Sequence, residues 1–327
     1  MSKYLVLATP RSFAKTDPAP IRLLEEHGCQ VLRLPTDGGD LRQQLLEYLP
    51  QADAVIAGLE SYDRTTLELG KKLKVVSRYG VGYDKVDVAA ARELGILVSI
   101  TPGANSNSVA DLAMALMLAA ARHVCPMDAA IRAGQNSKPT TGVEMWGKTL
   151  GVVGTGRIGK GVIQRAAGFQ MKVLANDAYP DQAFVEAHNG TYTDLDTLFR
   201  ESDFITLHAP YTEETKNMVD SRRLKEMKST AVLVNTARGG IVDEEALYHA
   251  LKEGEIGAAA LDATLVEPAC GSPLAALPNC ILTPARRPTR PGATWVCWPP
   301  KTCWMFSPPE PAPIWYNSQT ERFIYLL

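Results

Sequence analysis

The sequence has few of the features of secreted, membrane or metal-binding proteins. Its 327 residues hold only six cysteines, at positions 29, 125, 270, 280, 297 and 303, and no two of them form a CxxC pair. This spacing fits reduced thiols better than a disulfide framework or a zinc site, so no metal is predicted. No apolar run reaches the roughly 18 residues of a membrane span, and no basic-then-apolar signal segment opens the chain. We therefore expect a cytoplasmic protein with no membrane partner.

Charge is also scarce and nearly balanced. Charged residues make up 21% of the chain and the formal net charge is −2, so no basic excess exists to attract nucleic acid. Apolar residues make up 46% of the chain, which is a normal share for a globular protein. We expect no nucleic-acid partner, and about two domains for this length.

One glycine-rich stretch organises the middle of the chain. An apolar run over residues 149–154 predicts a short buried strand, which breaks at the glycines and is followed by a helical pattern. Gly154, Gly156 and Gly159 give the spacing GxGxxG between strand and helix, which is typical of dinucleotide sites. The first glycine permits a tight turn, the second lets the backbone approach a pyrophosphate, and the third lets the helix pack on the strand. The free N–H groups of the helix N-terminus favour a bound anion.

An acidic residue follows at a suitable distance. A second strand over residues 171–176 ends in Asp177, 18 residues after Gly159, and the acid that bonds a ribose lies about 20 residues past the glycines. Alone, Asp177 can also be a strand-end turn residue, and GxGxxG alone is a weak signal. Together they predict a dinucleotide site. Because a carboxylate repels the 2′-phosphate of NADP, NAD is the predicted cofactor.

Strand and helix signals alternate on both sides of this motif. Before it, strands are predicted to begin near residues 4, 30, 54, 74 and 96, with helices at 21–27, 41–49, 64–73 and 86–94. After it, strands are predicted at 204–207, 231–235, 256–261 and 280–283, with helices at 195–200, 221–227 and 244–253, the second of them opened by a serine cap. Such alternation predicts parallel sheets with helices on both faces. The fold class is therefore α/β, with two Rossmann-like, doubly wound parallel-sheet domains.

A long apolar helix joins the two halves. The Ala, Leu and Met-rich pattern over residues 109–122 predicts a helix that must be buried, in the core or against another subunit. A polar loop over 101–108 leads into it, and Asn105 and Asn107 in this loop are either capping residues or ligand groups.

Further candidate groups follow other predicted strands. Bare backbone at Gly80 and Gly82 suits a carboxylate, although a plain glycine turn explains them as well. Arg238 can grip a substrate carboxylate with two N–H groups or be an ordinary surface charge. Asp262 can bond a carboxamide or cap a helix, and Glu267 can orient a histidine or be a solvated charge.

Several stretches together resemble the NAD-dependent D-2-hydroxyacid dehydrogenase family, which includes phosphoglycerate dehydrogenase and glyoxylate/hydroxypyruvate reductase. The matching stretches lie at residues 78–84, 101–105, 108–110, 147–159, 208–210, 235–243, 267–268 and 283–284. The resemblance implies hydride transfer between NAD(H) and a small D-2-hydroxyacid or 2-ketoacid. It also implies a cofactor domain at 101–284 inserted into a substrate domain at 1–100, and homodimers joined through the cofactor domain and the helix near 109–122.

The resemblance assigns roles to individual residues. Arg238 and Glu267 are the expected catalytic residues, and Gly80, Val81 and Gly82 are expected with Arg238 at the substrate. The residues expected to line the cofactor are Gly154, Gly156, Arg157, Ile158, Gly159, Asp177, His208, Pro210, Thr215, Thr236, Ala237, Arg238 and Asp262. In such enzymes a histidine bonded to the glutamate moves the proton.

That histidine is replaced in this chain. The family places it directly after Thr283 and Pro284, where this sequence has Ala285. Composition changes at the same point, because residues 285–327 hold four of the five tryptophans and eight of the 22 prolines. No long helical or strand period is evident there, so we expect an atypical tail in place of the segment that returns to the outer domain. We therefore expect NAD binding with weak or absent turnover, and the alternative is a catalytically silent NAD-binding protein.

The genetic code offers one explanation for the tail. Codons for residues 294–307, read one nucleotide earlier, permit Met-Gly-Val-Leu-Ala-Ala-Glu-Asp-Val-Leu-Asp-Val-Leu, which is an apolar helix pattern. This indicates a frameshift in the coding DNA. The same shift restores no family-like segment over 285–293, so the event is not a simple one, and a genuinely divergent tail is the alternative.

Overall fold

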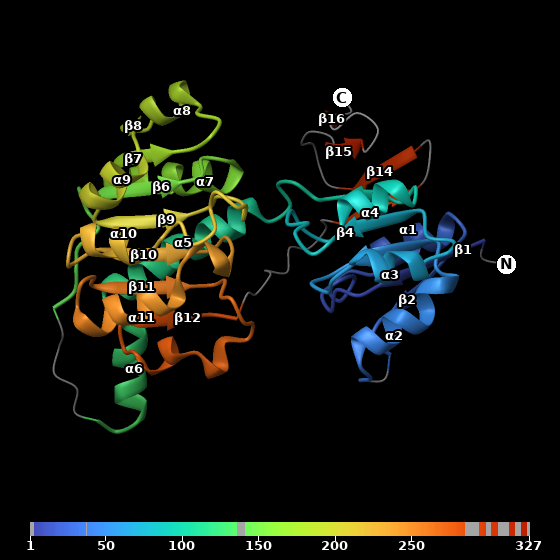
Figure 1. Ribbon diagram of the computed structural model, residues 1–327, viewed down its shortest axis with the longest axis horizontal. Helices are drawn as coiled ribbons and strands as arrows, with labels where there is room; N and C mark the ends of the chain where they lie inside the picture. The colour runs from blue at the N-terminus through green and yellow to red at the C-terminus, as the bar shows by residue number, and fades with distance from the viewer. Residues whose placement is uncertain are drawn as a thin grey trace. The chain divides into compact units, whose positions relative to one another are not determined.

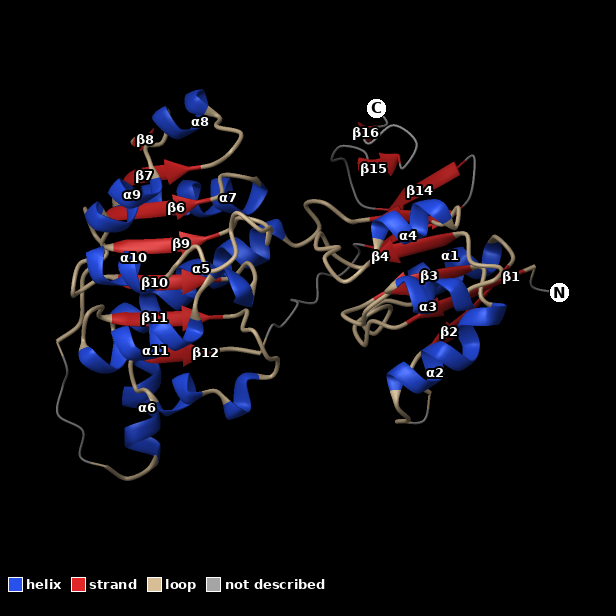
Figure 2. Ribbon diagram, in the orientation of Figure 1, coloured by secondary structure: helices blue, strands red, loops and turns tan. Residues whose placement is uncertain are grey.

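The structure, a computed structural model, describes residues 3–36, 38–135 and 141–284 and four later strands between 294 and 325. It divides into two compact units, residues 1–105 with 288–327, and residues 106–287. Each unit has its own sheet with helices packed on it (Figure 1, Figure 2). Because the last strands pair within the first unit, the second unit is inserted into the first.

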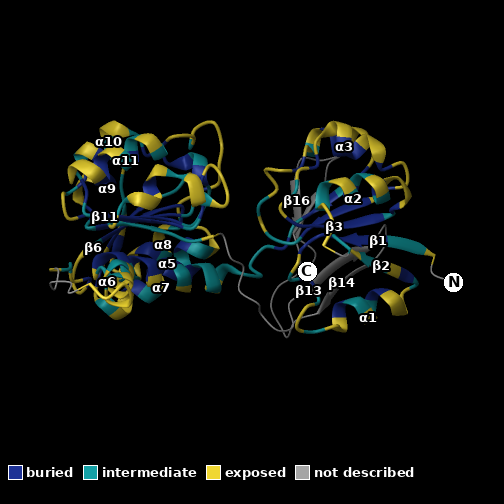
Figure 3. Ribbon diagram, turned by 90° about the horizontal axis from the view of Figure 1, so that it is seen from below, coloured by how far each residue is buried: buried dark blue, intermediate teal, exposed yellow. Residues whose placement is uncertain are grey.

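Parallel strands form most of the sheet of the first unit, in the order β5-β4-β3-β1-β2. The strands are β1 (Tyr4–Ala8), β2 (Cys29–Arg33), β3 (Ala54–Ala57), β4 (Val75–Arg78) and β5 (Leu97–Ser99). The helices are α1 (Ala19–Glu26), α2 (Leu41–Tyr48), η1 (Leu49–Gln51), α3 (Arg64–Leu69) and α4 (Val88–Glu93). Figure 3 shows α2 and α3 on one face of this sheet and α1 on the other. Successive side chains of a strand point to opposite faces of the sheet, so each face has its own apolar core. Leu7 and Val55 pack toward α2 and α3, while Val6 and Ile56 pack toward α1.

Four short strands occur in the atypical tail. β15 (Ile314–Asn317) and β16 (Arg322–Tyr325) pair antiparallel and extend the sheet at the β5 edge. β13 (Thr294–Trp298) and β14 (Thr302–Phe306) form a separate antiparallel pair. Each strand has only four or five residues. Strands this short leave no long alternating pattern in the sequence.

The sheet of the second unit is parallel throughout, in the order β12-β11-β10-β9-β6-β7-β8. Its strands are β6 (Thr149–Val153), β7 (Lys172–Asn176), β8 (Gly190–Tyr192), β9 (Phe204–Leu207), β10 (Val232–Asn235), β11 (Ala258–Leu261) and β12 (Cys280–Leu282). Its α-helices are α5 (Ser106–Ala121), α6 (Val124–Arg132), α7 (Arg157–Ala166), α8 (Gln182–Glu186), α9 (Leu195–Glu201), α10 (Ser221–Glu226) and α11 (Glu244–Glu253). Short η segments are η2 (Ala167–Phe169), η3 (Gly239–Ile241), η4 (Ala269–Gly271) and η5 (Pro273–Ala276).

Helices cover both faces of this sheet (Figure 3). Leu150 and Val152 of β6 pack toward α5 and α7, whereas Val153 packs toward α9, α10 and α11. Helix α5, with Ala113 and Met117 fully buried, is a core helix of this unit. In the described part of the chain no single helix has the length and apolarity to cross a membrane, although α5 and α6, bent by 64°, pass that test as a pair. Each of the two units thus has a largely parallel sheet with helices on both faces (Figure 3), which confirms the predicted doubly wound α/β fold.

Several element boundaries differ from the predictions. Asp220, not Ser221, caps α10, because its side chain accepts the Arg223 N–H while its backbone is extended. Helix α5 begins at Ser106, so Asn107 lies inside the helix and does not precede it. Helix α8 and strand β8 were not predicted; their five and three residues are too few to show a period.

Candidate functional site

The glycine-rich turn joins β6 to α7, as predicted. Gly154 has a φ of +91°, and a Cβ there would lie 2.6 Å from the backbone nitrogen of Ala209. A Cβ on Gly159 would lie 2.0 Å from the carbonyl oxygen of Gly154. Around Gly156 such an atom meets nothing within 4 Å. Two glycines therefore let the turn close, and the third leaves its backbone open to a ligand.

The N-terminus of α7 has the uncapped N–H groups that an anion can accept from. Gly156 is the N-cap, and no side chain caps the helix. Arg157 and Ile158 are its first two residues, so they lie at the positive end of the helix dipole. Uncapped N–H groups at this end are the usual partners of a phosphate.

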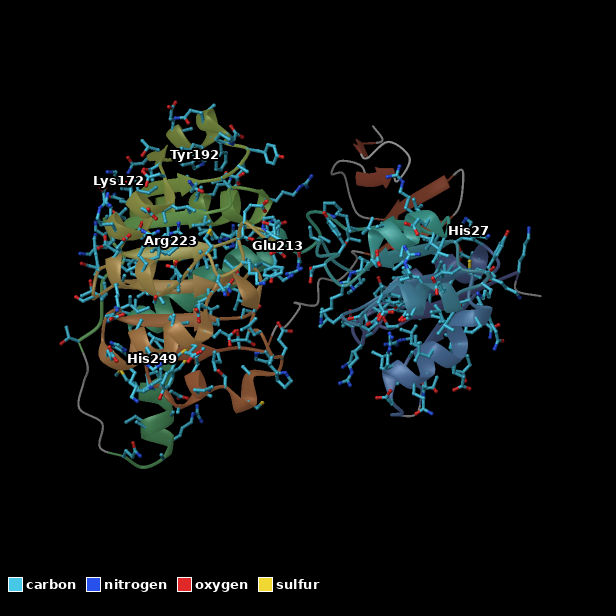
Figure 4. All side chains as sticks on the ribbon, viewed as in Figure 1. His27, Lys172, Tyr192, Glu213, Arg223 and His249 are labelled. Atoms are coloured by element: carbon cyan, nitrogen blue, oxygen red, sulfur yellow. The ribbon has the colours of Figure 1, made fainter. Side chains whose placement is uncertain are left out.

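Asp177 follows β7 and is hydrogen-bonded to the glycine turn. Its Oδ2 accepts hydrogen bonds from Thr155 N at 2.5 Å and from Thr155 Oγ1 at 3.1 Å, and its Oδ1 accepts from Tyr179 N at 2.8 Å. The Thr155 hydroxyl also pairs with the hydroxyl of Tyr192 at 2.7 Å; Tyr192, labelled in Figure 4, belongs to β8. Because a carboxylate has about four acceptor positions, Asp177 can still accept a bond from a ribose hydroxyl. We missed Tyr192 in the sequence because β8 itself was missed.

His208 lies where the strand order of the sheet reverses, between β6 and β9. Its Nε2 pairs with Thr206 Oγ1 at 2.9 Å and its Nδ1 with Thr236 Oγ1 at 3.3 Å. Burial lowers the pKa of His208 to about 3. The imidazole ring of His208 is therefore neutral near pH 7.

A buried asparagine shapes the loop that carries Arg238. The Oδ1 of Asn235, at the end of β10, accepts from Ala237 N at 3.0 Å, and its Nδ2 donates to the carbonyl oxygen of Arg238 at 2.7 Å. The Nη1 of Arg238 donates to the carbonyl oxygen of Ala237 at 2.8 Å. Thr236, Ala237 and Arg238 are thus held as one turn, on the same edge of the sheet as the glycine turn.

The segment before Glu267 packs directly on that loop. A Cβ on Gly239 would lie 2.3 Å from Leu265 N, and this N–H donates to Glu244 Oε1 at 2.6 Å. Burial raises the pKa of Glu244. Glu267 itself is exposed. Arg238 and Glu267, the two predicted catalytic residues, therefore lie on loops that touch each other.

The remaining cofactor candidates of this unit stabilise loops at the same edge. Asp262 follows β11, and its Oδ1 accepts from Thr283 Oγ1 at 2.7 Å. Thr215 Oγ1 donates to the carbonyl oxygen of Pro210 at 2.7 Å and accepts from Thr212 N at 2.7 Å. All the predicted cofactor residues thus follow the ends of β6, β7, β9, β10 or β11.

The three predicted carboxylate-binding residues belong to the first unit. Gly80, Val81 and Gly82 follow β4, where Arg78 Nε donates to the carbonyl oxygen of Gly82 at 2.9 Å and Thr101 N donates to that of Gly80 at 3.0 Å. Their contact with a substrate held by the arginine of the other unit stays a prediction. Ala285 lies outside the described residues.

Comparison with known proteins identifies the family. Residues 114–285 match the family described as D-isomer specific 2-hydroxyacid dehydrogenase, NAD binding domain. The chain belongs to this D-2-hydroxyacid dehydrogenase family. The second unit is therefore its NAD-binding domain, and NAD, the predicted cofactor, is confirmed.

Relatives within the D-2-hydroxyacid dehydrogenase family carry different names. The D-3-phosphoglycerate dehydrogenase of Methanocaldococcus jannaschii is 43% identical over 275 residues, which cover 82% of this chain and 52% of the relative. The chain thus spans about half the length of that relative. The hydroxypyruvate reductase of Thermotoga maritima is 42% identical over 248 residues, which cover 74% of this chain and 80% of the relative.

Solved structures that resemble this chain confirm the predicted fold. The TT0316 protein from Thermus thermophilus superimposes with a TM-score of 0.76 at 38% identity, over 86% of this chain and 89% of that one. The D-lactate dehydrogenase from Aquifex aeolicus, complexed with NAD and lactic acid, superimposes with a TM-score of 0.74 at 29% identity, over 86% and 88%.

Proposed function

We propose that this chain is an NAD-dependent oxidoreductase of small D-2-hydroxyacids and 2-ketoacids whose turnover is impaired by Ala285. The observation that carries the proposal is the open glycine turn at Gly156 with Asp177 bonded beside it. Family membership supports the reaction class. We further propose a cytoplasmic location and a function without nucleic-acid or membrane partners, on the balanced charge and scattered cysteines of the sequence.

The residues present fit NAD. The uncapped start of α7 and the open backbone of Gly156 would hold the pyrophosphate, and Asp177 would accept the ribose hydroxyls. His208 and Thr236 would line the far part of the cofactor, and the neutral ring of His208 places no positive charge there. The chemistry that this cofactor supplies is transfer of a hydride.

The same edge of the sheet carries groups for the substrate. The guanidinium of Arg238 can hold a carboxylate with two parallel N–H bonds. In the first unit, the backbone of Gly80, Val81 and Gly82 is proposed to bind a substrate carboxylate. Contacts of Gly239 and Glu244 with residues 264–265 support this proposal, because they keep the segment before Glu267 next to the loop of Arg238.

Proton transfer is the step that this chain is proposed to lack. An alanine at 285 carries no titratable group, and Glu267 then has no imidazole to orient. Loss of a general acid or base costs about 10² to 10⁴ in rate. We therefore propose normal NADH binding with turnover lowered by about this factor.

Two measurements on the full chain test the proposal. NADH binding is followed by calorimetry and by protection against melting, and reduction of glyoxylate and hydroxypyruvate is followed by NADH absorbance. Ala285→His should raise turnover by about 10² to 10⁴, whereas the matched control Ala285→Gln should not. Normal turnover by the unaltered chain would refute the impairment, and absence of NADH binding would refute the proposal as a whole.

A catalytically silent NAD-binding protein is the second candidate, favoured by Ala285 and the atypical tail. It predicts NADH binding with no turnover even in Ala285→His. Sequencing the coding DNA separates two origins of the tail, because an uninterrupted frame with no family-like reading nearby excludes the frameshift.

We also propose a homodimer through α5 and α6. The large apolar side chains exposed on these two helices are Leu118, Val124, Met127 and Ile131, and exposed apolar side chains of this kind are typical of a protein interface. Sedimentation of the full chain tests this, with Ile131→Glu expected to shift the dimer toward monomer.

A further inference from the structure

A carboxylate collects three hydrogen bonds at the carboxyl edge of the first unit's sheet. Glu60 Oε1 accepts from Thr9 Oγ1, from Gly58 N at 2.8 Å and from the hydroxyl of Tyr62 at 2.6 Å. Thr9 and Gly58 follow β1 and β3, which are neighbours in the sheet. Burial raises the pKa of the fully buried Tyr62, Glu60 raises it further, and Arg78 opposes them. The carboxylate therefore belongs to an ordered polar cluster at the strand ends.

This cluster adjoins the loop proposed to meet the substrate carboxylate. Tyr79 N donates to the carbonyl oxygen of Ala57 at 2.9 Å, and Arg78 Nη1 donates to the same oxygen at 3.3 Å. Arg78 Nε donates a hydrogen bond to the carbonyl oxygen of Gly82 at 2.9 Å. Because Ala57 directly precedes Gly58, one arginine connects the glutamate cluster to the glycine loop.

The charge of the cluster bears on substrate choice. Relatives of this chain include an enzyme named for a phosphorylated acid and one named for an unphosphorylated acid. Phosphate groups bind where backbone N–H groups at element ends are bare. Here the N–H of Gly58 already donates to Glu60 and to Thr9, and a phosphate would bring further negative charge beside a carboxylate. Leu59, which precedes Glu60 in the chain, and Val81 of the glycine loop are apolar and exposed, at 51% and 41%.

We propose that Glu60 is a specificity-determining residue that excludes a phosphate on the substrate's third carbon and leaves unphosphorylated acids as the substrate class. The Glu60 carboxylate accepts the hydrogen bonds that a phosphate would otherwise accept. Its negative charge also repels the phosphate. This inference rests on the proposed function, since it places the substrate at the glycine loop beside β4.

The test uses complexes that require no turnover. Calorimetry on the full chain, saturated with NADH, gives the dissociation constants of D-glycerate and of 3-phospho-D-glycerate. We expect the unaltered chain to bind the phosphorylated acid at least about tenfold more weakly. Glu60→Gln keeps the size and the acceptor but removes the charge, and should lower this ratio about tenfold, or about 1.4 kcal/mol, with D-glycerate affinity within about threefold of the unaltered chain. Glu47→Gln, an exposed glutamate of the same unit, should change neither constant.

Each outcome decides between the alternatives. An unchanged ratio in Glu60→Gln overturns the role of the charge. If that variant does not fold, equal binding of the two acids by the unaltered chain overturns the inference by itself. Tyr62→Phe, which removes one donor and keeps the charge, should retain the discrimination, and its loss would assign the effect to packing. If D-glycerate itself does not bind, the proposed function fails, and the inference with it.

Discussion

Replacing Gly159 by alanine should separate the packing role of the glycine turn from its ligand role. The added Cβ would lie 2.0 Å from the carbonyl oxygen of Gly154 and 3.0 Å from its carbonyl carbon. A carbon–oxygen contact of about 3.3 Å is already close, so the helix and the turn must separate by about 1.3 Å. Overpacking of this kind costs about 1 to 3 kcal/mol. For a domain of this size we expect the melting temperature to fall by about 2 to 12 °C, with NADH affinity lost as the turn opens.

Two further glycines provide the comparison. Around Gly156 and Gly168 an added Cβ meets nothing within 4 Å. Gly156→Ser places a preferred N-cap residue at a φ of −65°, so stability should hold or rise while NADH binding weakens by about tenfold or more, because the side chain fills the pyrophosphate position. Gly168→Ala should leave NADH binding unchanged and stability equal or higher by about 0.4 to 1 kcal/mol.

Melting followed by circular dichroism and NADH titration by fluorescence measure both quantities on each variant. The reasoning is refuted if Gly159→Ala melts with the unaltered chain and binds NADH as tightly. It is also refuted if Gly156→Ser retains full affinity, because the open backbone would then not be the place of the pyrophosphate.

Three other variants test other parts of the site. Asp177→Asn should weaken NADH binding and raise the NADPH/NADH affinity ratio, measured by parallel titrations, because the charge that repels a 2′-phosphate is gone. Burial lowers the pKa of His208 to about 3 from 6.5, so the unfolded chain binds more protons below pH 6.5 and stability should fall as the pH drops from there, by at most about 1.4 kcal/mol per pH unit. His208→Gln should remove this part of the slope in melting experiments between pH 7 and 5, whereas the exposed His27→Gln should not. Gly239→Ala, whose Cβ would lie 2.2 Å from the carbonyl carbon of Thr264, should lower the melting temperature and any residual turnover, with NADH affinity less affected than in Gly159→Ala.

The sequence predicts those features whose causes are local. The helix predicted at 244–253 is α11 with the same bounds, because its first turn is acidic, an aspartate precedes it and a glycine follows it. The glycine turn was equally predictable, because Gly154, Gly156 and Gly159 lie within six residues and each meets a local requirement of the turn. The capping error at α10 has a local cause too, because aspartate and serine stand side by side and both suit an N-cap.

Contacts between residues far apart in the chain could not be predicted from the sequence. The bond between His208 and Thr236 joins residues 28 positions apart and depends on β9 and β10 being neighbours. Tyr192 reaches the glycine turn from 37 positions away, on a strand of three residues. Among the three donors around Glu60, Gly58 and Tyr62 are two residues away in the chain, whereas Thr9 is 51 positions away and follows the neighbouring strand β1. These contacts orient the site, and none of them leaves a period or a motif.

We propose that cofactor binding and proton transfer depend on separate parts of this chain. In the described part of the chain, the contacts that shape the glycine turn come from residues that precede 285, among them Thr155, Asp177 and His208. The bond from Leu265 N to Glu244 likewise holds the loop before Glu267 without the tail. We therefore propose that a change beginning at 285 removes a proton-transfer group and leaves these contacts in place. For this reason we expect the protein to fail as a catalyst and to succeed as an NADH-binding protein; loss of both together would mean that the tail supports the second unit by contacts outside the glycine turn.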